Sequence, residues 1–286
     1  MTLQIPWWGK LAAKIILVRL PLGYAVWQRL GLFRHGQMDT SQYAIRVFNY
    51  HAEKAGLTNQ LHGKTVVELG PGDSIASAII AATHGAHSIL VDTDTFVRSD
   101  ISSYHELAHV LTKQGLHVPD LSTCTTIDEL LACCGAQYMT KGLASLAQIT
   151  SESVDMIFSQ AVLEHIRKRE FRAMMTECNR ILRRNGCCSH QVDLRDHLGG
   201  ALNNLRFSDR VWESQFFASS GFYTNRIRYS HMLDIFNEAG FKAEVSGVYR
   251  WDALPTPIGK LSNEFKNFAV DDLCVSMFDV ILRRKR

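Results

Sequence analysis

The chain has 286 residues, of which 46% are apolar, and a formal net charge of +3. This size and apolar content are typical of one large globular domain with an extension. The charge is far below that of a basic nucleic-acid-binding domain, so nucleic acid is not an expected partner. The seven cysteines show no Cys-x-x-Cys spacing. They are therefore expected to be free thiols in a reducing cytoplasm rather than part of a zinc knuckle or a disulfide framework.

Residues 1–38 contain five cations and no acidic residue. Their apolar residues recur at helical spacing, namely Trp7, Trp8, Leu11, Ile15 and Val18. A second short helix is expected over Leu22–Leu30. The apolar run is too short to span a bilayer, and no cleavage site of a signal peptide follows it. Two interpretations stay open: a helical cap packed on the rest of the chain, or weak peripheral contact with the anionic inner surface of a membrane.

The next helix is predicted over Gln42–Lys54 and closes at Gly56. After it, an apolar β-branched run at Thr65–Leu69 meets the turn Gly70-Pro71-Gly72, and Ser74 is placed to cap a helix over 75–82. Strand, glycine turn and helix start follow one another in this way in nucleotide-binding α/β folds. Glycine in the turn lets a ligand approach the backbone closely.

The turn departs from two other nucleotide-binding motifs. Position 75 is isoleucine where a dinucleotide fingerprint has glycine, and the Gly-Lys-Ser/Thr of a phosphate loop is absent. Glu68 would repel a pyrophosphate but suits a ligand with a positive charge and hydroxyl groups.

The run Glu68-Leu69-Gly70-Pro71-Gly72 resembles motif I of the class I S-adenosylmethionine-dependent methyltransferases. In that family the loop surrounds the methionine half of the cofactor. The resemblance implies an α/β fold with a Rossmann-like seven-stranded sheet. This sheet is mostly parallel, with an antiparallel last strand and helices on both faces. It also implies S-adenosyl-L-methionine as cofactor and makes Glu68, Gly70, Pro71 and Gly72 candidates for binding it.

Asp92 ends the next predicted strand, Ser88–Val91, roughly twenty residues after Glu68, the spacing at which this fold places a ribose-binding acid. Its carboxylate could accept hydrogen bonds from both ribose hydroxyls, with Asp94 as the alternative. Leu143 is expected against the adenine.

Helices are predicted over 102–114 and 127–134, with a third strand at 136–139. A second motif begins with the apolar strand that starts at Val154 and continues as Ser159-Gln160-Ala161-Val162-Leu163-Glu164-His165. It resembles the fourth strand of the same family, which is commonly followed by Val-Leu-Glu-His. The resemblance places Ser159, Gln160 and Ala161 beside the methionine end of the cofactor and the transferring methyl group. Glu164 and His165 are expected in the first turns of a helix. His165 is either a general base or a positioning residue.

The remaining elements complete the expected sheet. A helix over 168–182 and the turn Asn185-Gly186 precede a fifth strand at 187–192, as they do in that family. A helix over 227–239 precedes two final strands, 241–250 and 275–282. The predicted organisation is an N-terminal helical extension over 1–60 and a methyltransferase domain over 61–286. That domain carries insertions at about 196–228 and 252–272.

Asp193, Asp196 and His197 follow the fifth strand, where open α/β sheets bind their ligands. The insertion after them is rich in aromatic residues, including Trp212 and Tyr223. They could form an acceptor wall, or they could pack the insertion on the sheet. A metal site at His190, Asp193 and Asp196 is not favoured, and no metal is expected.

The expected reaction is an in-line methyl transfer to a hydroxyl of a sugar or saccharide-containing acceptor. The candidate bases are His197, Asp193 and His165. The pattern around Asp193–Arg228 resembles methyltransferase domains associated with bacterial glycan and lipid-linked saccharide modification. A lipid or quinone acceptor and a non-catalytic binding module are the alternatives. A cytoplasmic location, with or without peripheral membrane contact, is expected.

Overall fold

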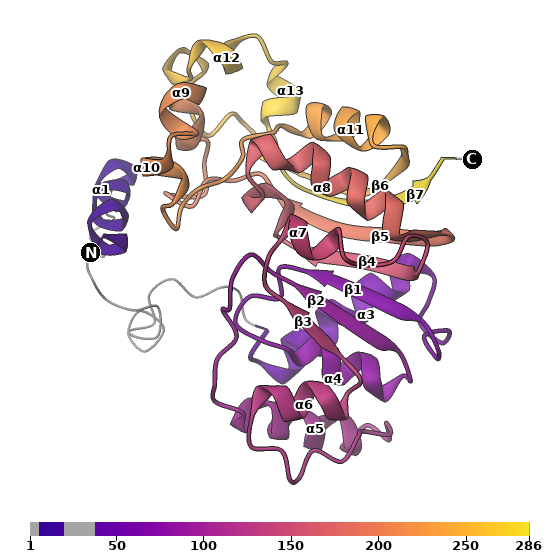
Figure 1. The fold of residues 1–286 in the computed structure, drawn as a ribbon. Coiled ribbons are helices and arrows are strands. Elements are labelled where there is room, and N and C mark those ends of the chain that lie inside the picture. The colour runs from indigo at the N-terminus through magenta and orange to yellow at the C-terminus, as the bar shows by residue number, and fades with distance from the viewer. Residues whose placement is uncertain (1–5, 20–37, 286) are drawn as a thin grey trace.

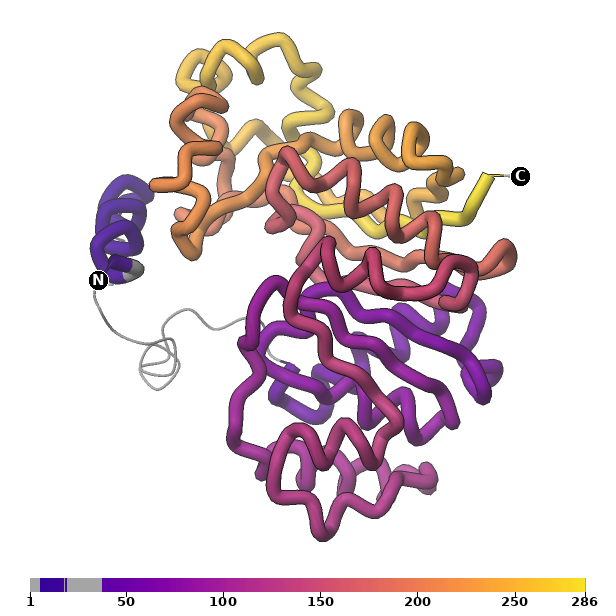
Figure 2. Tube along the Cα trace, viewed as in Figure 1, coloured from indigo at the N-terminus to yellow at the C-terminus, as the bar shows by residue number. Residues whose placement is uncertain are grey.

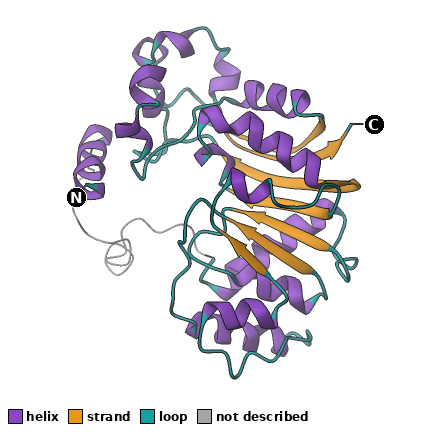
Figure 3. Cartoon of the chain, viewed as in Figure 1, coloured by secondary structure: helices purple, strands orange, loops and turns teal. Residues whose placement is uncertain are grey.

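A computed structural model describes residues 6–19 and 38–285 of the chain (Figure 1). The second predicted N-terminal helix, over 22–30, lies outside the described residues. The centre of the molecule is a seven-stranded sheet with helices on both faces (Figure 3). No helix in the described ranges is long and apolar enough to cross a membrane.

The strand order is β3-β2-β1-β4-β5-β7-β6, where only β7 runs antiparallel to its neighbours β5 and β6. The predicted fold class is therefore confirmed. The strands are β1 (Thr65–Leu69), β2 (His87–Val91), β3 (Gln137–Met139), β4 (Val154–Gln160), β5 (Leu182–Asp193), β6 (Phe241–Arg250) and β7 (Val275–Arg284).

Alternate residues of each strand point to opposite faces, and both faces are buried. Val66 belongs to a core shared with α3 (Ser41–Ala55), α4 (Ala76–Thr83), α5 (Ser102–Lys113) and α6 (Ile127–Cys133). Its neighbour Val67 belongs to the opposite core, shared with α7 (Leu143–Leu146), α8 (Lys168–Ile181) and α11 (Tyr229–Glu238). Two cores on one sheet explain why the central strands read as continuous apolar runs.

Two segments outside the sheet pack against each other through a small core that contains Leu205 and Phe265. After β5 come η2 (Asn203–Arg206), α9 (Asp209–Trp212) and α10 (Gln215–Ala218). Between β6 and β7 lie η3 (Ile258–Lys260), α12 (Asn263–Lys266) and α13 (Val270–Leu273). The N-terminal helix α1 (Trp7–Val18) lies beside α10 in the tube view (Figure 2). Trp7, Leu11 and Ile15 of α1 pack against the core formed by Leu198, Trp212, Phe222 and Tyr223.

Most predicted elements differ from the observed ones only at their ends, but two need correction. Glu164 and His165 lie in a 3-10 turn, η1 (Leu163–His165), and α8 begins only at Lys168. The fifth strand is longer than predicted, because it begins at Leu182 and includes the turn at Asn185. Ser74 does accept a hydrogen bond from Ala76 N at 3.1 Å, although the residue at the N-cap position of α4 is Ile75.

Candidate active site

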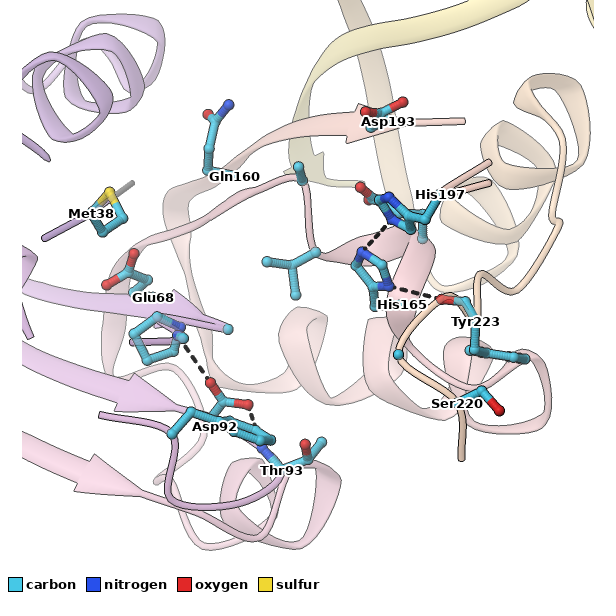
Figure 4. A pocket seen from close by; sticks show the side chains of 18 of the residues that line it. Met38, Glu68, Asp92, Thr93, Gln160, His165, Asp193, His197, Ser220 and Tyr223 are labelled. Carbon is cyan, nitrogen blue, oxygen red and sulfur yellow. Dashed lines mark hydrogen bonds between the residues drawn. The ribbon is translucent and has the colours of Figure 1, made fainter. Parts of the chain in front are cut away.

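A cavity of about 680 Å³ lies at the carboxyl ends of β1, β2, β4 and β5. One side is formed by the turn after β1, the end of β2 and the end of β4. The other side is formed by η1, the residues after β5, the loop 218–223 and the inner face of α1. Figure 4 shows its labelled side chains. We call the first side the cofactor side, because it carries most of the predicted cofactor-binding residues, and the second the acceptor side, because it carries all three candidate bases.

The turn after β1 has the tight geometry that its glycines predict. Gly70 and Gly72 both have positive φ, 66° and 64°. A Cβ at Gly70 would lie 2.6 Å from Cγ1 of Val162, so even alanine would collide there. Pro71 lies between them and also lines the cavity. The missing side chains leave room for a ligand to lie on the backbone.

Asp92 faces this turn from the end of β2. Its Oδ2 accepts a hydrogen bond from Gly72 N at 3.1 Å, and its Oδ1 accepts one from Thr93 N at 2.7 Å. A carboxylate has further lone pairs on both oxygens, so it can also accept from two ribose hydroxyls. Asp94, the alternative, is exposed and lies outside the cavity lining.

Glu68 lies at the bottom of the cofactor side and is almost completely buried, at 3% exposure. Burial raises the pKa of its carboxyl to about 8, the nearby Asp92 adds to this, and a hydrogen bond from the Ser77 hydroxyl opposes it. A cation placed in the cavity would favour the ionised form. The site therefore fits the sulfonium or ammonium group of S-adenosylmethionine.

The end of β4 completes the cofactor side. Ala161 has a positive φ of 53°, unusual for a residue with a Cβ, and marks a sharp turn out of the strand. Gln160 and Ala161 line the cavity, but Ser159 does not. Ser159 is fully buried and its Oγ lies 2.8 Å from Nδ1 of His190. Leu143 is the first residue of α7. It packs against the core shared with α8 and α11, and it does not line the cavity either. Phe96, which follows Asp92, lines the cavity instead.

His165 and His197 form a hydrogen-bonded pair on the acceptor side (Figure 4). Nδ1 of His165 lies 2.9 Å from the carbonyl oxygen of Tyr223, which can only accept, so this nitrogen carries a proton. The two Nε2 atoms lie 3.1 Å apart, and the rings stack with centroids 4.8 Å apart. When both rings are neutral, Nε2–H of His197 donates to His165. The lone pair of His197 is then on Nδ1.

Burial of the His197 ring in this pair lowers its pKa, and the nearby Lys14 ammonium lowers it further. Its outer edge is exposed at the cavity. His197 is therefore neutral near pH 7 and can accept a proton. Lys14 of α1 donates to the His197 carbonyl oxygen at 3.2 Å and itself lines the cavity.

The carboxylates after β5 are already occupied by protein partners. Both oxygens of Asp193 are bound by Arg195, at 2.9 Å from Nε and 2.7 Å from a terminal guanidinium nitrogen. Asp193 lines the cavity but is a weak candidate for a base. Asp196 is buried and accepts from the backbone of Leu198, Gly199, Gly200 and Asn203, so it shapes the loop. His190, the third member of the unfavoured metal set, faces Ser159. Among the described residues, no group of three or more metal-ligating side chains is found.

Two cavity residues, Lys14 and Glu164, were not predicted to belong to the site. Lys14 lies far along the chain from the sheet, and only its amphipathic helix was predicted. Glu164 was predicted only as part of the Val-Leu-Glu-His motif, but it is 2% exposed, and neither carboxyl oxygen has a hydrogen-bond partner. Burial raises the pKa of the Glu164 carboxyl well above its usual value and favours its neutral form.

Comparisons with known proteins agree with the cofactor side of this site. Residues 67–189 match the family model of a methyltransferase domain. A search of curated proteins found no match. YcgJ from Bacillus subtilis is 14% identical, with 84% of this chain and 97% of that chain covered and a TM-score of 0.44.

Two other structures belong to named enzymes. Burkholderia thailandensis 1,6-didemethyltoxoflavin-N1-methyltransferase, with bound 1,6-didemethyltoxoflavin and S-adenosylhomocysteine, is 9% identical, covers 86% of this chain and 78% of its own, and has a TM-score of 0.44. Haemonchus contortus phosphoethanolamine N-methyltransferase 2 is 13% identical, with coverages of 84% and 53% and a TM-score of 0.46. These TM-scores are low, so the fold assignment rests on the sheet order and the family match.

The family match over residues 67–189, together with the sheet order and the glycine turn, identifies this part of the chain as a methyltransferase domain of the S-adenosylmethionine-dependent kind. Its cofactor is S-adenosylmethionine. The match spans β1 to the middle of β5 and so covers the cofactor side. The residues after β5 and helix α1, which form much of the acceptor side, lie outside it.

Proposed function

We propose that this protein transfers a methyl group from S-adenosylmethionine to a hydroxyl of a saccharide-containing acceptor. The observation that carries the proposal is the His165–His197 pair in the same cavity as the cofactor turn. The acceptor oxygen would bond to the methyl carbon of S-adenosylmethionine as the carbon–sulfur bond breaks, and S-adenosylhomocysteine would leave. An attacking hydroxyl must lose its proton, and neutral His197 can accept it. Hydrogen-bonded His165 can share the resulting positive charge.

The charges around the acceptor side favour an acceptor that carries an anionic group. Asp193 is paired with Arg195, and burial favours the neutral form of Glu164. Among the described residues that line this side, Lys14 is then a cation without a carboxylate partner, so its ammonium can pair with an anionic group of the acceptor. Burial lowers the pKa of its ammonium, as does neighbouring Lys10, and an anion there would oppose both effects.

The outer face of α1 supports a lipid-linked acceptor as a second candidate. Trp8 and Ile16 are each 62% exposed, whereas Lys14 and Leu17 of the same helix line the cavity. The outer face of α1 carries these apolar residues, and its inner face lines the cavity. Binding of the outer face to a membrane would therefore place the cavity opening at the membrane surface.

Labelled methyl transfer tests both candidates. S-adenosylmethionine with a labelled methyl group is incubated with the protein and with separated glycan, lipid-linked saccharide and lipid fractions of cells. Label in a saccharide-containing fraction supports the proposal. Label in saccharide-free lipid alone contradicts it, and no transfer to any fraction favours a non-catalytic binding module.

The role of His197 has its own test. His197→Gln should lower kcat by about 10²- to 10⁴-fold, the usual contribution of a general base, while S-adenosylmethionine affinity stays close to wild type. His109→Gln on the exposed side of α5 is the matched control. Unchanged kcat in His197→Gln would remove His197 as the base.

A further inference from the structure

A chain of side-chain hydrogen bonds runs across the sheet from the cavity wall. Gln160 Nε2 donates to Gln191 Oε1, and Gln191 Nε2 donates to Asp279 Oδ1 at 2.9 Å. On the other side, Gln160 Oε1 lies 3.1 Å from Nε2 of His51 in α3. Nδ1 of His51 lies 2.8 Å from Ser189 Oγ. The chain therefore joins α3 and three strands, and only Gln160 among these residues lines the cavity.

The sheet register makes this chain possible. Gln160 of β4 is the direct partner of Gln191 in β5, and Gln191 is the direct partner of Asp279 in β7. Asp279 in turn pairs with Gly247 of β6, where the regular register between β6 and β7 is interrupted. A Cβ at Gly247 would lie 2.8 Å from Asp279 Oδ2, so a side chain there would displace the carboxylate. Tyr249 also donates to Oδ2, at 3.2 Å.

Asp279 sets the direction of every bond in the chain. A carboxylate only accepts, so Gln191 must turn its NH₂ group toward Asp279 and its oxygen toward Gln160. Gln160 then donates to Gln191 and turns its own oxygen toward His51. That oxygen requires a proton on Nε2 of His51. Burial lowers the pKa of His51 to about 4, so the ring is neutral and its Nδ1 accepts from the Ser189 hydroxyl.

One N–H of Gln160 is not used by this chain. Its Oε1 accepts from His51, and one hydrogen of its Nε2 goes to Gln191. The second hydrogen remains at a residue of the cavity wall. Because Glu68 pairs with Phe158, Gly70 and Gln160 each follow that pair by two residues. Gln160 therefore leaves the sheet beside the cofactor turn.

We propose that Asp279 is a positioning residue for the cofactor. It acts through Gln191 to hold the Gln160 amide in the orientation that offers an N–H to an oxygen at the amino-acid end of S-adenosylmethionine. Without Asp279 the two amides and the His51 ring could reverse together, and Gln160 would then present its oxygen to the ligand.

The isosteric variant Asp279→Asn tests the direction of the chain. An amide at 279 can donate as well as accept, so both directions become allowed. Nitrogen-15 NMR reports which ring nitrogen of His51 is protonated, and a His51→Asn variant identifies the signal. We expect protonated Nε2 in the wild type and a mixture of the two neutral forms in Asp279→Asn. Protonated Nδ1 in the wild type, or no change in the variant, overturns the proposal.

Calorimetry with two ligands tests the effect on the cofactor. S-adenosylhomocysteine has the amino-acid end, whereas 5′-methylthioadenosine lacks it. We expect Asp279→Asn to weaken S-adenosylhomocysteine by about three- to tenfold, the loss of one ordinary hydrogen bond, and to leave methylthioadenosine unchanged. Gln191→Met interrupts the hydrogen-bond chain without changing Asp279. It should also weaken S-adenosylhomocysteine binding and leave methylthioadenosine binding unchanged. Equal changes for the two ligands in both variants would show only a structural role and overturn the proposal.

Discussion

Burial determines the preferred protonation state of several titratable side chains at this site. It raises the pKa of Glu68 and Glu164, and it lowers the pKa of His197 and His51. All four groups therefore prefer their neutral forms near pH 7. Each is neutral because burial penalises its charged form, and a ligand of opposite charge can restore that form.

The raised pKa of Glu68 predicts a dependence of stability on pH. Between its ordinary pKa of 4.5 and about 8, the unfolded chain loses the Glu68 proton while the folded protein keeps it. The folded state binds more protons, so stability without ligand falls as pH rises through this interval. The contribution is fully present below pH 4.5 and is lost as pH passes about 8.

Glu68→Gln should therefore unfold at nearly the same denaturant concentration as wild type at pH 5 and at a higher one at pH 8. Chemical denaturation of both proteins across this range measures the difference. The affinity of wild type for cationic S-adenosylmethionine should rise over the same range, because ionised Glu68 favours the bound cation. Parallel stability curves for the two proteins would contradict the assignment.

Asp92 provides a prediction for the cofactor itself. Asp92→Ala removes a carboxylate that holds Gly72 N and faces the turn. S-adenosylmethionine binding should weaken by roughly 1–3 kcal/mol, the scale of a hydrogen bond to a charged group. Calorimetry measures the loss. The control is Asp94→Ala, which changes an exposed acid two residues away, and equal losses in the two variants would argue against a specific ribose contact.

At the scale of elements, the aromatic segment after β5 is mainly a small core. Trp212 is 0% exposed and donates from its indole nitrogen to Thr224 O at 2.7 Å. Phe222 is 1% exposed and packs against it. Tyr223 does line the cavity, and its hydroxyl binds Glu213. Trp212 and Phe222 therefore pack within this segment and against α1 rather than on the sheet, while Tyr223 and the loop 218–223 line the cavity.

Trp212→Ala should destabilise the protein by about 3–5 kcal/mol, as expected for removing a large buried aromatic side chain. Denaturant unfolding measures this loss. Val211→Ala is the matched control, because Val211, next to Trp212 in α9, is 40% exposed and its change should stay within about 0.5 kcal/mol. A Trp212→Ala protein of wild-type stability with weaker acceptor binding would instead make Trp212 a direct part of the acceptor wall.

At the scale of the whole molecule, α1 joins the N-terminal extension to the active site. Its inner face packs on Phe207 through Trp7 and reaches the cavity with Lys14. Arg19 lies 3.7 Å above the ring of Phe216 and donates to its carbonyl oxygen. These contacts support the interpretation of α1 as a helical cap packed on the rest of the chain. The exposed Trp8 and Ile16 on the same helix leave membrane contact as a separate prediction.

Trp8→Ser combined with Ile16→Ser should abolish weak, salt-sensitive sedimentation with phosphatidylglycerol vesicles and leave thermal stability unchanged. Each cation near an anionic surface adds about 1 kcal/mol, so high salt should also release the wild type. Val270→Ser, an exposed apolar residue on α13, is the control, and phosphatidylcholine vesicles are the neutral surface. Wild type that stays in the supernatant at low salt would leave α1 as a cap alone.

Local sequence patterns were enough to predict the sheet and which residues line most of the cofactor side. Strand patterns span a few consecutive residues, and Glu68, Gly70 and Gly72 lie within one turn, so local spacing identifies them. Asp92 was also predictable, because this fold places the ends of its first two strands side by side. The boundaries near Glu164 were not, because the 3-10 turn there depends on contacts such as Asn225 N to Glu164 O at 2.7 Å.

Which distant side chains meet on the acceptor side depends on how separate segments of the chain pack together. Lys14 reaches His197 through the docking of a separate helix, and His165 meets His197 because η1 and the end of β5 lie together. The register of three strands, β4, β5 and β7, aligns Gln160, Gln191 and Asp279, which no local pattern connects. Burial, which shifts the pKa values of these groups, is likewise set by packing between segments that are far apart along the chain.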